Sequence, residues 1–280
     1  MDLLVTTDWL AAELGSADLT LLDATYLLPG TPRDPLAEFR AAHIPGARFL
    51  DLETLCDPDD PLPSMVPDAA PFAARMAALG VNPQDRIVVY DNSPHASAGR
   101  GWWLMRLFGA RQVAILDGGF ARWTAEGRPT ESGEGRSDPG RFAAERADGW
   151  IATKADLLAN LASCAAQVVD ARGGARFRGE GDEPRAGMAP GHIPGSRSLP
   201  NDQLFSADGL RKRGDALRAA FAEAGVDLDR PLIMSCGSGV TACNLLFGAA
   251  LLGKRDVRIY DGSWSEWGAD PDTPKAVGAA

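Results

Sequence analysis

Short apolar runs alternate along the chain with longer segments that carry apolar residues at helical spacing. The runs of strand length are residues 86–91, 112–119, 168–171 and 232–236. Two segments with helical spacing are residues 215–225 and 240–253, and the second ends in Gly253, which suits a C-terminal cap. Short strands separated by helices predict an α/β fold in which a parallel sheet has helices on both faces. Such sheets bind ligands beyond the carboxyl ends of their strands.

The chain contains the same landmarks twice. The matching pairs are LLDATY at 21–26 with VVDARG at 168–173, AAHIPGAR at 41–48 with PGHIPGSR at 190–197, and LDGGFARW at 116–123 with YDGSWSEW at 260–267. Three pairs in the same order at nearly constant spacing predict two copies of one domain. We therefore expect an N-terminal domain at residues 1–130 and a C-terminal domain at residues 147–280. Residues 131–146, rich in Gly, Ser and charged side chains, are the predicted linker.

Charge and hydropathy exclude several classes of partner. The formal net charge of −10 repels nucleic acid and anionic lipid, so an anionic substrate needs local arginines or backbone N–H groups. The longest nearly apolar run, residues 240–253, is shorter than the roughly 20 residues that cross a bilayer. Asp2 and Asp8 stand where a secretory signal carries basic and apolar residues. We expect no nucleic-acid partner, no membrane attachment and a cytoplasmic location.

The cysteines and histidines do not form a metal site. The four cysteines are Cys56, Cys164, Cys236 and Cys243. No CxxC pair occurs, and no histidine lies near Cys236 and Cys243, so we expect reduced thiols without a disulfide framework or a bound metal. His43 and His192 each precede Ile-Pro-Gly at the same place in the two copies, which favours a shared structural role.

The two copies differ at the end of one predicted strand. Aligning RIVVYD with PLIMSC places Asp91 opposite Cys236. The following residues also differ, DNSPHASAGRG in the first copy and CGSGVTAC in the second. Only the second copy therefore has a thiol at this position, and the first copy is predicted to be inactive.

The segment after the second strand has the layout of an activated cysteine. A buried strand leads to Cys236, Gly237 and Gly239 permit conformations closed to other residues, and a helix begins near Val240 or Thr241. N–H groups of such a loop and the positive end of the helix favour a thiolate over a thiol. The alternative is that the cysteine is a small buried apolar residue. A cysteine phosphatase is excluded, because it needs an arginine six residues after the cysteine, and that residue is alanine.

Four segments carry a resemblance to a known family. CGSGVTAC, GHIPG, DARGGARFRGEGDEPRAG and YDGSWSEWG resemble the two-domain rhodanese superfamily, and the CGSGVT loop is similar to its 3-mercaptopyruvate sulfurtransferase branch. The resemblance implies tandem rhodanese-like domains, the first inactive and the second catalytic. Thiosulfate sulfurtransferases of the family typically carry the more basic loop CRKGVT.

The resemblance implies a sulfur transfer in two steps. The Cys236 thiolate takes the outer sulfur of 3-mercaptopyruvate as a persulfide and releases pyruvate. The sulfur then passes to cyanide, a small thiol or a thioredoxin-like protein, and no cofactor is needed. The loop residues expected to serve catalysis or hold the substrate are Ser238, Gly237, Gly239, Val240 and Thr241.

Arginines are expected to hold the carboxylate and ketone oxygens of the substrate. The two substrate arginines of the family fall on Arg176 and Arg185, and the planar fork of an arginine suits a carboxylate. Arg178 is a third candidate. Apart from the resemblance, such arginines are more often solvated surface charges.

One part of the family pattern is altered. In this branch the loop serine acts with an acid and a histidine from the first domain, which correspond here to Glu53 and Ser64. A serine is not a base near neutral pH, so proton delivery falls to water, Ser238 or another group. Two alternatives stay open: a thiosulfate:cyanide sulfurtransferase, and a module that carries persulfide or regulates without turnover.

Overall fold

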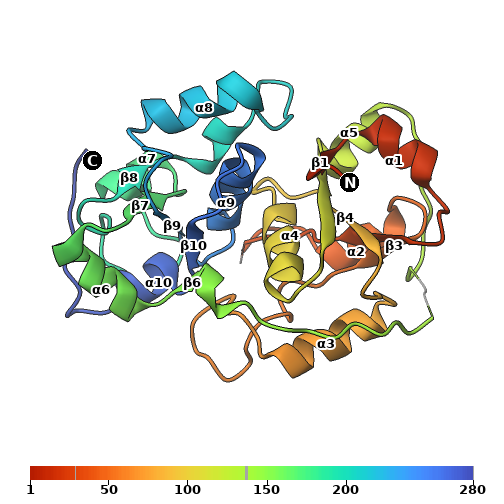
Figure 1. Cartoon of the computed structure of the whole chain (residues 1–280), viewed down its shortest axis with the longest axis horizontal. Helices are drawn as coiled ribbons and strands as arrows, with labels where there is room; N and C mark the ends of the chain where they lie inside the picture. The colour runs from red at the N-terminus through yellow and green to blue at the C-terminus, as the bar shows by residue number, and fades with distance from the viewer. Residues whose placement is uncertain (29, 136–137, 280) are drawn as a thin grey trace. The chain divides into compact units, whose positions relative to one another are not determined.

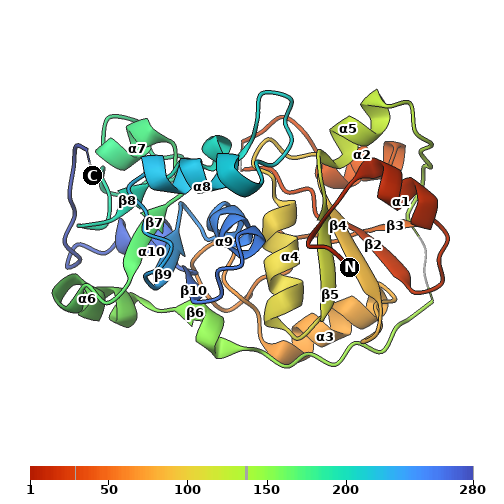
Figure 2. The ribbon, with the colours of Figure 1, turned by 45° about the horizontal axis from the view of Figure 1, so that its top comes forward.

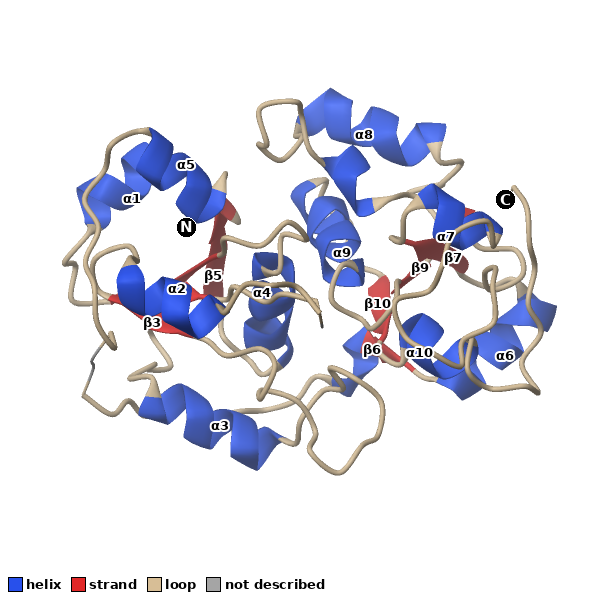
Figure 3. Cartoon of the chain, turned by 180° about the vertical axis from the view of Figure 1, so that it is seen from behind, coloured by secondary structure: helices blue, strands red, loops and turns tan. Residues whose placement is uncertain are grey.

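A computed structural model describes residues 1–28, 30–135 and 138–279. The chain divides into two compact units. One contains Met1–Pro58 and Val66–Ala147, and the other contains Asp59–Met65 and Asp148–Ala280. Each unit has strands at its centre and helices around them (Figure 3). Within the described ranges, no helix is both long and apolar enough to span a membrane.

The first unit is built on a five-stranded parallel sheet in the order β1-β5-β4-β2-β3. Its strands are β1 (Leu4–Val5), β2 (Leu19–Asp23), β3 (Ala47–Phe49), β4 (Arg86–Tyr90) and β5 (Gln112–Leu116). Its helices are α1 (Thr7–Glu13), α2 (Pro35–Ala41), α3 (Ala69–Ala78), α4 (Ala98–Leu107) and α5 (Gly119–Ala125). Figures 1 and 2 show these helices around the sheet.

Helices cover both faces of this sheet, as the apolar pattern predicts. On one face, Leu10 of α1, Phe39 of α2 and Trp123 of α5 pack against the apolar side chains of the strands. On the other face α4 lies so close to β4 that a β-carbon on Gly101 would come within 2.9 Å of the Val89 side chain. Successive residues of the strand point to opposite faces, so this central strand is buried on both.

The second unit repeats the plan with the order β6-β10-β9-β7-β8, also parallel. Its strands are β6 (Ile151–Ala152), β7 (Gln167–Asp170), β8 (Arg197–Ser198), β9 (Leu232–Ser235) and β10 (Val257–Tyr260). Its helices are α6 (Lys154–Ser163), α7 (Gly174–Arg178), α8 (Gly214–Glu223), α9 (Ala242–Leu251) and α10 (Ser263–Trp267), with 3-10 turns η1 (Asp148–Trp150) and η2 (Asn201–Leu204). The strand order matches the first unit position for position, which confirms the predicted tandem α/β fold.

The two faces of the second sheet are also covered. Leu157 of α6 and Trp264 and Trp267 of α10 belong to the core on one face. On the other face α9 contacts both β9 and β10, and Gly248 of this helix packs against Phe221 of α8. Helix α9 is buried from Ala242 to Ala249 because it lies between the sheet and another helix, and only Ala250 and Leu251 at its end are partly exposed.

Local sequence signals set the ends of several helices. The Thr153 side chain accepts a hydrogen bond from the N–H of Asp156, whose carboxylate accepts the N–H of Thr153, so α6 begins with a capping box. Asp34 caps α2 directly before Pro35. Gly253 follows α9 with a φ of +82°, as expected of a glycine that ends a helix.

The described residues of the stretch predicted as a linker, 131–135 and 138–146, and Ala147 directly after it form hydrogen bonds with the rest of the first unit. Glu131 pairs with His43, the N–H of Gly140 donates to the carbonyl of Ala77, and the N–H of Ala147 donates to Leu107. These bonds explain why the first unit extends to Ala147.

The paired histidines have the same structural role in both units. The ring of His43 stacks on Phe39 at 3.9 Å, and the ring of His192 stacks on Phe177 at 3.8 Å. Each Nδ1 lies within hydrogen-bond distance of the carbonyl oxygen of its stacking partner. Both side chains are buried, so each histidine braces a turn, as the repeat predicts.

Candidate active site

Cys236 lies at the carboxyl end of β9, in the middle of the second sheet. It follows Ser235 directly, and α9 begins at Ala242. The residue is only 2% exposed, and Gly239 in the intervening loop has a φ of +75°. A left-handed residue turns the chain sharply, and glycine adopts it without a steric cost. The observed layout of strand, glycine-containing loop and helix is the one that the sequence predicts.

Residues of helix α10 hold this loop through hydrogen bonds. The hydroxyl oxygen of Ser263 accepts the N–H groups of Cys236 and Gly239, both at 3.1 Å, and donates to the carbonyl of Tyr260 at 2.8 Å. The N–H of Trp264 donates to the carbonyl of Cys236 at 2.9 Å. Both the N–H and the hydroxyl of Ser265 donate to the carbonyl of Gly237. The loop therefore has a fixed shape, although it belongs to neither a helix nor a strand.

The other N–H groups of the loop are available to a ligand. Among the described residues, no acceptor is bonded to the main-chain N–H of Gly237, Ser238, Val240 or Thr241. Four unused donors beside a thiol, at the start of a buried helix, are a setting that stabilises an anion. The arrangement suits a thiolate, a persulfide or an anionic substrate group.

The first unit shows how the equivalent loop is satisfied when no thiol is present. Asp91 follows β4 as Cys236 follows β9, and its carboxylate accepts the N–H of Ser93 at 2.9 Å and the N–H of Ala98 at 2.6 Å. Ala98 is the first residue of α4. A built-in carboxylate thus occupies the position where the second unit has a sulfur, which supports the loop as an anion site and the first copy as inactive.

Arg176 lies against the cysteine loop. A β-carbon on Gly237 would come within 3.2 Å of Nη2 of Arg176, so glycine leaves room there for the guanidinium. The same Nη2 donates to Glu183 at 2.6 Å, and the partly exposed side chain keeps a buried Nε that has no partner among the described residues. The predicted substrate arginine therefore has its guanidinium against Gly237, the residue that follows Cys236.

A buried ion network holds this arginine. Arg172 donates to Asp170 at 2.8 Å and to Glu183 at 2.7 Å, and its guanidinium lies 4.3 Å from the ring centre of Trp264. Glu183 therefore joins the two arginines. The sequence analysis did not identify Arg172 or Glu183 as site residues, although both lie in the DARGGARFRGEGDEPRAG segment that carries the resemblance.

The other predicted residues have different surroundings. Arg185 is half-buried and has no hydrogen bond or ion pair with a described residue. Arg178 pairs with Glu180 at 2.7 Å on the exposed side of α7, which is typical of a surface ion pair. The Ser238 side chain is buried in the loop, and its hydroxyl likewise has no partner in the described chain.

The residues at the remaining family positions lie outside the cysteine loop. Glu53 is exposed in a turn where its N–H donates to Asp51. Ser64 has a φ of +62° and belongs to the Asp59–Met65 segment of the second unit. Cys243 is fully buried in α9, and its thiol donates to the carbonyl of Gly239, so it is part of the core.

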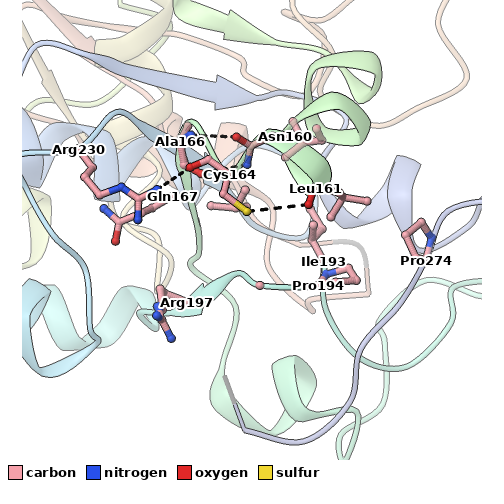
Figure 4. A pocket seen from close by; sticks show the side chains of 13 residues that line it. Asn160, Leu161, Cys164, Ala166, Gln167, Ile193, Pro194, Arg197, Arg230 and Pro274 are labelled. Atoms are coloured by element: carbon pink, nitrogen blue, oxygen red, sulfur yellow. Dashed lines mark hydrogen bonds between the residues drawn. The ribbon is translucent and has the colours of Figure 1, made fainter.

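A separate cavity of about 430 Å³ occurs in the second unit beside Cys164 (Figure 4). It lies at the amino end of β7. Because the strands are parallel, this is the opposite end of the strands from Cys236. Two of its polar side chains are engaged: the Cys164 thiol points to the Leu161 carbonyl, and Arg230 donates to the Cys164 carbonyl. In the described ranges no cluster of side chains could hold a metal ion.

Relatives of known activity match nearly the whole chain. A mouse (Mus musculus) 3-mercaptopyruvate sulfurtransferase is 44% identical over 94% of this chain and 91% of its own length. The Escherichia coli K12 protein of the same name is 42% identical over 96% of each chain. A thiosulfate sulfurtransferase from Cricetulus griseus is 41% identical over 98% of this chain and 95% of its own.

Solved structures and family models agree with the repeat. The crystal structure of SseA from E. coli, which represents the 3-mercaptopyruvate sulfotransferases, matches this chain with a TM-score of 0.86 and 40% sequence identity. The match covers 95% of this chain and 100% of that one. The model of the rhodanese-like domain matches residues 6–126 and again residues 153–270. The chain therefore belongs to the rhodanese family, as a tandem of two rhodanese-like domains.

Proposed function

We propose that this chain is a sulfurtransferase that moves sulfur from 3-mercaptopyruvate through Cys236 to a thiol or cyanide, with release of pyruvate. The observation that carries the proposal is a set of main-chain N–H groups in the Cys236 loop that have no partner among the described residues, whereas the first copy places a carboxylate in the equivalent loop. Donors of this kind stabilise a thiolate before the reaction and a terminal persulfide anion after it.

The first half-reaction transfers one sulfur atom. The Cys236 thiolate attacks the sulfur of 3-mercaptopyruvate, an S–S bond forms, and the C–S bond breaks with its electron pair left on carbon. The resulting enolate takes a proton and leaves as pyruvate. Water or the hydroxyl of Ser238, the buried loop side chain with no described partner, supplies that proton. In the second half-reaction an acceptor thiolate or cyanide attacks the outer sulfur and restores the Cys236 thiolate.

Arg176 and Arg185 bind the carboxylate and ketone oxygens of the donor. The partly exposed Arg176 guanidinium lies against Gly237 of the loop, and Arg185 has no partner among the described residues, which supports a role for both in binding the donor. The neutral residues Gly237 and Ser238 favour this donor over thiosulfate, because a dianion gains more from added positive charge.

The proposal extends to the setting of the reaction. All four cysteines are free, which fits a reducing compartment such as the cytoplasm and a thiol acceptor, including a thioredoxin-like protein. No metal or organic cofactor takes part in the proposed steps, because the sulfur donor and the thiolate supply all the electrons.

Intact-mass analysis tests the proposal. The protein is mixed with 3-mercaptopyruvate in the absence of an acceptor, and released pyruvate is measured in parallel. We expect a mass increase of one sulfur atom on Cys236, one pyruvate per chain, and loss of both signals in Cys236→Ser. Pyruvate release without a persulfide, or a persulfide on another cysteine, would contradict the assignment. Persulfide that forms only from a thiol persulfide donor would favour the carrier module.

A further inference from the structure

Ser263 has a backbone conformation that its side chain makes unfavourable. Its φ is +49°, the left-handed region that residues with a β-carbon seldom occupy, and it is completely buried. The equivalent residue of the first unit is Gly119, with a φ of +56°. The inactive copy thus has the residue that fits this conformation, and the copy with the thiol has a serine instead. Strained residues of this kind concentrate at functional sites.

The side chain of Ser263 divides the N–H groups of the cysteine loop into two sets. Its oxygen accepts the N–H groups of Cys236 and Gly239, one at the start of the loop and one after its turn. Its proton goes to the Tyr260 carbonyl, so the oxygen is oriented as an acceptor. The remaining N–H groups, those of Gly237, Ser238, Val240 and Thr241, stay unpaired among the described residues.

The first unit holds the equivalent loop differently, through the side chain of the residue at the cysteine position. The Asp91 carboxylate bonds to the N–H groups of Ser93 and Ala98, and the carbonyl of Asp91 accepts the N–H of Phe120. A β-carbon on Gly119 would lie only 2.3 Å from that carbonyl oxygen, so this copy excludes a serine. A thiol is a weak acceptor and cannot tie its own loop in this way.

We propose that Ser263 is a positioning residue that fixes the cysteine loop, so that its unpaired N–H groups stay arranged around the sulfur of Cys236. This inference rests on the proposed function of Cys236. Ser263 does not contact the substrate in this account. It acts by holding Cys236 at the start of the loop and Gly239 after its turn through one oxygen atom.

The test uses Ser263→Ala and Ser263→Gly in the full chain. Alanine keeps the β-carbon and removes the oxygen. Glycine also removes the oxygen, and it is the residue that the first unit has at this position. The glycine variant therefore still tests the proposal if the alanine variant fails to fold. A control is Thr273→Val, which removes another buried hydroxyl of the same unit, one that donates to Trp267 and Asp270 and does not touch the loop.

The first readout is the rate of Cys236 alkylation by iodoacetamide as a function of pH, measured without a sulfur donor in a background with Cys56 and Cys164 replaced by serine. We expect the midpoint of this profile to rise by about one pH unit in both Ser263 variants, because a loosened loop stabilises the thiolate less. Thr273→Val should keep the wild-type midpoint even if its melting temperature falls by as much as that of the Ser263 variants. A wild-type midpoint in Ser263→Gly would overturn the proposal.

The second readout is turnover of 3-mercaptopyruvate. We expect kcat/KM to fall about ten- to hundredfold in Ser263→Gly, mainly through kcat, because the substrate arginines lie outside the loop. The two readouts separate two kinds of failure. A wild-type protein without turnover would contradict the proposed function, while the alkylation profile would still show whether Ser263 positions the loop. A change in KM alone would contradict the positioning role.

Discussion

Cys236 and Asp91 directly follow equivalent strands of the two units. The type of residue at this position decides what each loop can bind. Asp91 brings its own negative charge and uses it to satisfy two N–H groups of its loop. In the Cys236 loop, the main-chain N–H groups of Gly237, Ser238, Val240 and Thr241 stay unpaired among the described residues. A charge carried by the chain cannot leave, whereas a sulfur atom can be taken up and passed on. The residue at this position therefore separates a loop that carries its own anion from one able to bind an exchangeable anion.

Replacing the thiol tests this difference directly. Cys236→Ser should abolish turnover and leave the melting temperature within a few degrees of wild type, because a hydroxyl fits the same space but does not form a persulfide. Cys164→Ser is the matched control, since that cysteine is exposed at the opposite edge of the sheet. Pyruvate release is the measurement. Turnover that persists in Cys236→Ser would remove the central residue from the account.

The arginines give a second prediction at this scale. Arg185→Ala and Arg176→Ala should each lower kcat/KM for 3-mercaptopyruvate by at least about tenfold, because each loses a charged hydrogen bond to the donor. The loss with thiosulfate should be smaller, since thiosulfate has no carboxylate to hold. Arg178→Ala, a surface arginine paired with Glu180, should behave as wild type. Equal losses with both donors would mean that the arginines have another role.

Individual residues also show where prediction from sequence stopped. The position of Cys236, its glycine-containing loop and the equivalence with Asp91 followed from the repeat, because the two copies can be aligned. Glu183 was missed, since its role depends on a side-chain contact to Arg176 across a turn. Ser263 could have been found from the alignment, because a serine replaces a glycine of the other copy there. Its left-handed backbone was visible only in the structure.

Helix α9 is the element that connects the loop to the core. A glycine with positive φ precedes it at Gly239 and another follows it at Gly253. Both flank the same buried helix, but only the first belongs to the cysteine loop. Backbone strain at the two ends should therefore cost similar stability and have different effects on catalysis.

This pair of glycines provides a matched experiment. Gly239→Ala and Gly253→Ala should each lower the free energy of unfolding by about 1–2 kcal/mol, because alanine is disfavoured at positive φ. A β-carbon on Gly253 would meet no atom within 4 Å, so strain is the whole effect there. Only Gly239→Ala should lower kcat, as measured by pyruvate release. Wild-type kcat in Gly239→Ala would show that the exact loop shape is unimportant.

Most elements were predictable from periodicity, and the loop boundaries were not. The strands at 86–90 and 232–235 lie within one residue of the predicted runs, since buried strands are continuous apolar segments. Helix α9 begins two residues later than the apolar pattern starts. Val240 and Thr241 form a turn whose N–H groups stay unpaired among the described residues. The apolar pattern that predicts the helix therefore already includes part of the cysteine loop.

At the scale of the whole molecule, the two units share a fold but differ in the electrostatics of their cores. In the second unit, Asp170 at the end of β7 is paired with buried Arg172. The equivalent residue of the first unit is Asp23, which is also buried but has Thr25 where the second unit has the arginine. Burial raises the pKa of Asp23 to about 6, against hydrogen bonds from Thr25 that lower it.

The raised pKa predicts how stability depends on pH. The folded chain holds a proton on Asp23 that the unfolded chain releases near pH 4, so this residue lowers stability as pH rises from about 4 to about 6, and the loss persists above pH 6. Asp23→Asn keeps an acceptor for Thr25 and should stabilise the protein at pH 8 by up to about 3 kcal/mol, with no gain below pH 4. Calorimetric melting at both pH values measures this difference.

The second unit supplies the control. Asp170→Asn breaks a buried ion pair and should destabilise the protein at pH 8, by about 3–5 kcal/mol. The two substitutions, made at equivalent positions, are thus expected to have opposite signs. Destabilisation by Asp23→Asn that is larger at pH 8 than at pH 4 would contradict the raised pKa, because it would show that the carboxylate of Asp23 is charged and stabilising in the folded chain.

The measurement that tests the central claim most directly is a comparison of two sulfur donors on one preparation. Pyruvate release from 3-mercaptopyruvate with a thiol acceptor is measured beside sulfite release from thiosulfate with cyanide. The account predicts a kcat/KM larger by about a hundredfold for 3-mercaptopyruvate, equivalent to about 2.7 kcal/mol of transition-state stabilisation. A preference for thiosulfate, or no turnover of either donor, would contradict it.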